Sequence, residues 1–215
     1  MLTYEKLKSR QRAERDNYPE HLSLRVHRAL SWLNRAEQCD DTDGRFIFMW
    51  IAFNAAYANE TGEYRIAEGR RVSDFLRRLV DLDSQQHLAD IVWNHYSGAI
   101  RLLLDNQYVF QPYWDHQNRL PESDDWQQRF DTAKMASHLA LANRDTGTVL
   151  GIVFNRLYTL RNQLIHGGAT YGGQVNRKQL SDGSRLLGEV VPSIISIMMD
   201  NSQSHWGEAC YPVIR

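Results

Sequence analysis

The chain is poor in proline and cysteine. Its 215 residues include only five Pro and two Cys. With so few helix-breaking residues, and with helix-forming residues throughout, the composition favours a mostly helical fold. Cys39 and Cys210 are too few to form a disulfide framework or a zinc site of their own. A reduced, cytoplasmic setting is therefore expected.

Long apolar runs are also missing. No segment approaches the roughly 18 uninterrupted apolar residues of a membrane span, and residues 1–6 form no apolar signal-peptide core. We therefore expect no membrane association. The longest apolar stretch covers 46–58, is interrupted by Asn54, and is typical of a buried central helix. Asn54 must find hydrogen-bond partners there, either as a polar anchor of the core or as support for a site.

Neither sign of charge is in excess. The net charge is -1, from 25 basic and 26 acidic residues. This balance argues against a broad positive field for binding nucleic acid, while a local phosphate site is still compatible with it. The acidic turn Asp40–Gly44 lacks the further ligands of a calcium loop, and we expect it to cap the helix that follows. No nucleotide-binding glycine loop or zinc-protease motif is found, so neither a metal nor a cofactor is expected.

Apolar periodicity predicts the helices. Amphipathic helices are expected over 22–38, 66–82, 85–104, 123–142, 147–166 and 176–200, around the apolar helix 45–58. Gly167 should end the helix 147–166, and Pro192 should kink the last helix. The aromatic stretch 108–114 is expected to be a loop packed over the core, with base stacking as the alternative. With no repeat or linker, the sequence predicts one all-α domain over 1–215.

The first 20 residues are polar and carry Arg10, Arg12 and Arg15. A solvated helix or arm is the simplest interpretation of such a charged run, and an RNA-contacting arm is the alternative.

Residues that could do chemistry gather in Arg161-Asn162-Gln163-Leu164-Ile165-His166. Arginine is a permanent cation that binds phosphate, and histidine moves protons near neutral pH. Asn162 and His166, four residues apart, share one helix face, whereas Arg161 and His166 do not. In the simplest interpretation Arg161 forms a salt bridge and His166 is a helix-end cation. Alternatively, a symmetric dimer would join two such helix ends in one site.

This hexapeptide resembles the signature of HEPN domains, in which an arginine with a polar neighbour precedes a histidine by four to six positions. The apolar stretch 45–54 and the tail from 166 to 213 also resemble a group of bacterial HEPN proteins. The similarity covers about 22–58 and 147–213, which we take as the core, and 59–146 is an elaboration with inserted helices.

The resemblance implies an up-and-down helical bundle that forms a homodimer along the apolar stripe of the Arg161 helix. It also implies metal-independent RNA cleavage by 2′-hydroxyl attack. Arg161 would stabilise the phosphorane, His166 would act as general acid or base, and Asn162 would orient the histidine or the phosphate. Asn54, Arg45 and Arg177 are expected to bind the substrate.

HEPN proteins act in toxin–antitoxin, phage-defence and stress systems, so an antitoxin or a defence protein is an expected partner. The sequence leaves two alternatives open. One is a non-catalytic HEPN module that binds a nucleotide, a nucleic acid or a partner protein. The other is a structural scaffold, which only the near-neutral charge favours.

Overall fold

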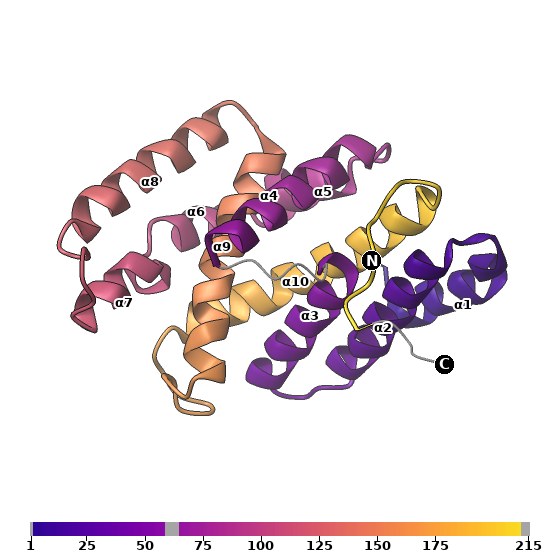
Figure 1. The fold of residues 1–215 in the computed structure, drawn as a ribbon. Helices are drawn as coiled ribbons and strands as arrows, with labels where there is room; N and C mark the ends of the chain where they lie inside the picture. The colour runs from indigo at the N-terminus through magenta and orange to yellow at the C-terminus, as the bar shows by residue number, and fades with distance from the viewer. Residues whose placement is uncertain (1, 59–64, 212–215) are drawn as a thin grey trace.

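A computed structural model (Figure 1) describes residues 2–58 and 65–211, with side chains from residue 69 onward in the second range. Every regular element in these ranges is helical, which confirms the all-α prediction. No helix in the described part of the chain is both long and apolar enough to cross a membrane. In Figure 1, α1 and α8 lie at opposite ends of the molecule, and α10 runs between them.

One group of helices packs around α3 (Thr42–Tyr57), with α2 (Glu20–Glu37) and α10 (Arg177–Asp200) against it. The Asp41 carboxylate accepts a hydrogen bond from the Gly44 N–H at 2.6 Å, which confirms the predicted cap. Phe46 and Phe53 of α3 are fully buried, as expected for a helix that is apolar on nearly every face. The helix α10 continues through Pro192 as a single element.

A second group centres on α9 (Thr146–Ile165), which packs against α4 (Arg65–Leu82). Two glycines of α9 allow the two helices to approach closely. A Cβ at Gly147 would lie 2.9 Å from Arg77 Cγ, and one at Gly151 would lie 2.9 Å from Ser73 Oγ. The helix that carries Arg161 is therefore covered by α4, which belongs to the predicted elaboration.

Two predicted elements differ from the structure. The expected helix 85–104 is divided into α5 (His87–Asp90), the π-helix η2 (Ile91–His95) and α6 (Ser97–Leu104). The break follows from the wider π turn, in which Tyr96 N–H donates to Ile91 O at 3.0 Å. The expected aromatic loop is helical, as the short 3-10 helix η3 (Gln107–Val109) and α7 (Gln111–Gln117). Pro112 lies in the first turn of α7, where its missing N–H costs no helical hydrogen bond. The next helix, α8 (Trp126–Ala142), was predicted.

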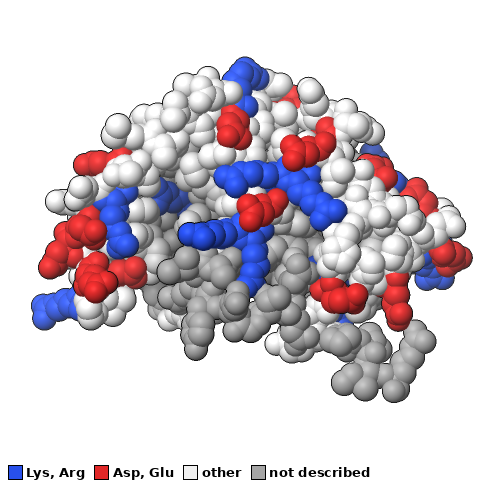
Figure 2. All heavy atoms as spheres, turned by 45° about the horizontal axis from the view of Figure 1, so that its top comes forward, with Lys and Arg blue, Asp and Glu red and all other residues white. Residues whose placement is uncertain are grey.

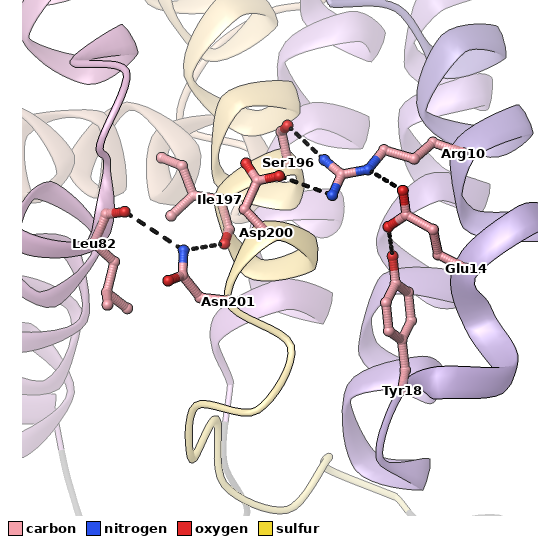
Figure 3. Close-up of polar contacts among 8 residues, drawn as sticks. All are labelled: Arg10, Glu14, Tyr18, Leu82, Ser196, Ile197, Asp200 and Asn201. Atoms are coloured by element: carbon pink, nitrogen blue, oxygen red, sulfur yellow. Dashed lines mark hydrogen bonds and ion pairs between the residues drawn. The ribbon is translucent and has the colours of Figure 1, made fainter.

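The first 20 residues are helical and largely exposed, which is one of the two expected forms, and they are not a free arm. They form α1 (Tyr4–Glu14) and the 3-10 helix η1 (Arg15–Asn17), and α1 buries Leu7 and Gln11. Figure 3 shows Arg10 reaching from α1 to α10, where its guanidinium lies 2.8 Å from Asp200. Glu14 accepts from both Arg10, at 2.8 Å, and the Tyr18 hydroxyl, at 2.6 Å. Arg10 thus fastens α1 to the last helix.

Candidate functional site

The candidate site lies at the C-terminal end of α9. The helix ends at Ile165, and His166 is its C-cap residue. Gly167 follows with φ at +71°, the left-handed conformation that favours glycine at this position, as predicted. The backbone closes over the helix end because Gly167 N–H donates to Leu164 O and Ala169 N–H to Gln163 O, at 3.2 and 3.1 Å. Arg161 and Asn162 thus lie on the last ordered turn, and His166 lies just beyond it.

Arg161 is held by its neighbour and by an aromatic ring. Its Nη1 donates to the Asn162 side-chain oxygen at 3.0 Å, and the guanidinium carbon lies 5.8 Å from the Tyr158 ring centroid. Its Nε is buried and has no hydrogen-bond partner among the described residues. Asn162 therefore orients Arg161, whereas the resemblance implied that it orients the histidine or the phosphate. An arginine with a partly unsatisfied guanidinium retains donors for an acceptor such as phosphate.

His166 is exposed and only its backbone is fixed. Its N–H donates to Asn162 O at 3.0 Å. Within the described ranges, the imidazole makes no hydrogen bond or ion pair, so nothing in one chain selects its tautomer or its orientation. The structure thus brings Arg161 and Asn162 together and leaves the His166 side chain apart from both.

The loop that follows His166 is anchored to the start of α3 by Asp43 and Arg177. Asp43 is 7% exposed, accepts from the Gly172 N–H at 2.8 Å and forms a two-pronged ion pair with Arg177. Burial alone would raise the pKa of the Asp43 carboxyl. The hydrogen bonds from Arg177 and Gly172 outweigh this effect and hold the pKa below its usual range. Arg177, expected to bind substrate, is thus engaged in positioning this loop.

Gln163 is a positioning residue that the sequence analysis missed. Its side-chain amide donates to Tyr108 O at 2.8 Å and accepts from Asn176 Nδ2 at 3.0 Å. The end of α9 is thereby joined to η3 on one side and to the loop before α10 on the other. The only signal in the sequence was its place inside the hexapeptide.

The other two predicted binding residues, Arg45 and Asn54, lie on α3, about two and a half turns apart. Arg45 lies beside α10, where its Nη2 is 3.2 Å from the place a Cβ would occupy at Gly188. Its Nε is buried without a partner in the described part of the chain. Asn54 lines a cavity of about 190 Å³ between α3, α4, α7 and α9. Tyr158 lines the same cavity, and its ring lies next to the Arg161 guanidinium. Asn54 and Arg161 are therefore both neighbours of the space around Tyr158.

A second buried arginine of α9 was also missed. Arg156 is 3% exposed, and its guanidinium lies against two rings that contact each other, 4.3 Å from the Phe110 centroid and 5.7 Å from that of Phe130. Its Nε and Nη2 have no partner among the residues described. Burial lowers the pKa of this guanidinium to about 10. A cation buried without a carboxylate is unusual.

The described residues contain no group of three or more His, Cys, Asp or Glu side chains arranged to hold a metal ion. Cys39 and Cys210 are not joined by a disulfide. Compared with models of protein families, with curated proteins and with solved structures, the chain shows no match.

Proposed function

We propose that the chain is a metal-independent endoribonuclease of the HEPN type, acting as a toxin or as an effector in phage defence or stress. The observation that carries the proposal is the Arg161 guanidinium, which Asn162 orients through Nη1 and whose Nη2 makes no hydrogen bond in the described ranges. A fixed guanidinium with donors to spare suits the charge that develops on a phosphate under attack.

The reaction is a transesterification within the RNA strand. The 2′-oxygen forms a bond to the adjacent phosphorus, and the bond to the 5′-oxygen of the next nucleotide breaks, leaving a cyclic phosphate. One histidine takes the 2′-hydroxyl proton and a second gives a proton to the leaving 5′-oxygen. Arg161 stabilises the extra negative charge of the phosphorane.

One chain supplies one exposed His166, so we propose that two copies build the site. The apolar stripe of α9 offers little surface for this contact, because Leu150, Val153, Leu157 and Leu160 are at most 2% exposed within a single chain. Exposed apolar side chains remain near the hexapeptide: Ile165 is 47%, Tyr171 75% and Val175 76% exposed. A two-fold contact through these residues would cover them and bring two copies of Arg161 and His166 together.

The surface charge is compatible with local contacts to RNA. On the face shown in Figure 2, Lys and Arg side chains gather near the middle with Asp and Glu among them, and no unbroken basic surface spans this face. Such a surface provides little non-specific attraction for bulk nucleic acid. Recognition would then depend on few phosphates, and binding should fall only shallowly with salt concentration.

The test is cleavage of labelled single-stranded RNA and DNA of matched sequence. Arg161→Ala and His166→Ala should each abolish RNA cleavage, Arg161→Lys should fail substantially, and DNA should stay intact for lack of a 2′-hydroxyl. Because the groups act as a unit, the double variant should be little worse than either single one. His138→Ala is the matched control, since His138 is an exposed histidine on α8 paired with Asp105.

Cleavage should survive EDTA, and light scattering at micromolar concentration should give the mass of a dimer. Val175→Glu should give a monomer without activity. Wild-type cleavage by folded His166→Ala protein would refute the catalytic assignment. A strictly monomeric wild-type protein would refute the two-copy site.

A non-catalytic module that binds a nucleotide, a nucleic acid or a protein is the second candidate. The unconstrained imidazole of His166 favours it, because a catalytic histidine is usually oriented by a partner. Binding of RNA without any cleavage, unchanged by His166→Ala, is the outcome that would select this function.

A further inference from the structure

We propose that the cavity between α3, α4, α7 and α9 binds one unpaired nucleobase of an RNA strand whose phosphate contacts Arg161. That the ligand is RNA follows from the proposed function. That it carries a flat, uncharged, hydrogen-bonding ring follows from the cavity.

The walls of the cavity suit a flat ring. Trp50, Tyr57, Phe154 and Tyr158 line it, and the Trp50 ring centroid lies 6.0 Å from that of Phe154 and 6.1 Å from that of Tyr158. An apolar cavity of about 150 Å³ admits benzene, and this one, of about 190 Å³, has room for a larger ring. Aromatic side chains that surround a base gain stacking energy whatever its sequence identity.

The polar groups of the lining are uncharged. They include the side-chain amides of Asn54, Gln111 and Asn155, and no Lys, Arg, Asp or Glu is among the lining residues described. Gln111 donates to Asp115 at 2.8 Å. Neither the Asn54 and Asn155 amides nor the Trp50 indole N–H has a partner in the described part of the chain. A largely apolar pocket with a few unsatisfied polar groups is typical of a ligand site, and primary amides pair with the donors and acceptors on a base edge.

Arg161 continues the side of α9 that lines the cavity. Phe154 and Asn155 lie three and four residues after Gly151, and Tyr158 lies four and three residues after them. Arg161, three residues after Tyr158, is the next position on this side. Its guanidinium lies 5.8 Å from the Tyr158 ring centroid. Asn155 is exposed and marks the open side. A base that enters there leaves its own backbone phosphate outside the cavity, next to Arg161.

The experiment measures binding separately from cleavage. The probe is a fluorescent seven-nucleotide RNA strand with 2′-O-methyl groups throughout, which cannot undergo 2′-hydroxyl attack, together with strands that each lack the base at one position. Binding is followed by fluorescence anisotropy. One or two of the abasic strands should bind about tenfold more weakly or worse, within the range that stacking on aromatic rings supplies.

Asn155→Trp, which fills the open side, should weaken the parent strand by a similar factor and remove its advantage over the abasic strands. The matched control is Gln128→Trp, at an exposed position of α8, which should behave as wild type. Circular dichroism and thermal unfolding establish that both variants fold.

Equal binding of the parent and of all the abasic strands would overturn the base pocket, as would an Asn155→Trp variant that binds like wild type. These results would leave the proposed cleavage intact if natural RNA were still cut. Conversely, base-dependent binding by a protein that cuts no RNA would support the pocket and refute the cleavage.

Discussion

Replacing the buried Arg156 with methionine should stabilise the protein. Arg156 is 3% exposed, and its Nε and Nη2 have no hydrogen-bond partner among the described residues. Burial lowers the pKa of the guanidinium from its ordinary value to about 10, a shift of more than two pKa units. At about 1.4 kcal/mol for each pKa unit, keeping this cation charged in the folded state costs roughly 3 kcal/mol.

The stacking rings offset part of that cost. Cation–π contacts in a desolvated site contribute about 2 kcal/mol, and the nearer ring, Phe110, lies 4.3 Å from the guanidinium carbon. Methionine keeps the apolar contact with both rings and adds a sulfur–aromatic contribution of about 0.5–1 kcal/mol. The net expectation for Arg156→Met is a gain of about 1–2 kcal/mol in the free energy of unfolding, since apolar replacement of a buried charge is often stabilising.

The assay is urea unfolding at pH 8, followed by circular dichroism. Arg129→Met, at an exposed position on α8, is the control and should change stability by less than about 0.5 kcal/mol. The gain should also shrink with rising pH. Because the folded pKa is the lower one, the unfolded wild-type chain binds more protons than the folded chain above about pH 10. Wild-type stability therefore rises as the pH passes 10. A loss of more than about 1 kcal/mol in Arg156→Met would refute the reasoning, because the rings would then more than compensate for desolvation.

Three further predictions concern the rest of the fold. Gly183→Ala should lower the free energy of unfolding by about 1–3 kcal/mol, because its Cβ would lie 2.7 Å from Leu157 Cδ2. Gly98→Ala, whose Cβ would have no neighbouring atom within 4 Å, should be neutral or stabilising by up to about 1 kcal/mol. Thermal unfolding compares the two variants. Asp43→Asn should cost about 2 kcal/mol and lower the Tm by about 4–8 °C, with the difference from wild type lost as the pH falls through the lowered pKa of Asp43. The hydrogen bond to Glu189 raises the pKa of His95. The stabilisation from this contact is therefore full below pH ~6.5 and is lost as the pH rises through the folded pKa of His95. The urea midpoints of wild type and His95→Gln should differ more at pH 5.5 than at pH 9.

Each of these three has an outcome that would contradict it. Equal stability of the two glycine variants would mean that the α9–α10 contact can relax. An Asp43→Asn protein with the wild-type Tm would mean that the loop is held by other contacts. A pH-independent effect of His95→Gln would mean that the His95–Glu189 contact is absent in solution.

The sequence by itself determined the long helices and the cap of α3. Apolar spacing is a local property, and it placed α2, α4, α8, α9 and α10 because each buries one face. Asp41 caps α3 and Gly167 follows α9, since both signals depend on nearby backbone geometry. The sequence also brought the hexapeptide to attention, because arginine, amide and histidine carry chemistry wherever they are placed.

Only the tertiary structure decided which of those groups has spare hydrogen-bonding capacity. Nothing in the sequence distinguishes Arg10 and Arg177 from Arg161 as phosphate-binding candidates. In the structure, however, Arg10 forms an ion pair with Asp200 and Arg177 forms one with Asp43, both far away along the chain. The cavity beside Tyr158 unites residues from four helices, and no periodicity within one helix can predict it. Ion pairs and cavities depend on distances between segments remote in sequence. They are fixed only when the helices pack, whereas a helix is largely encoded in its own residues.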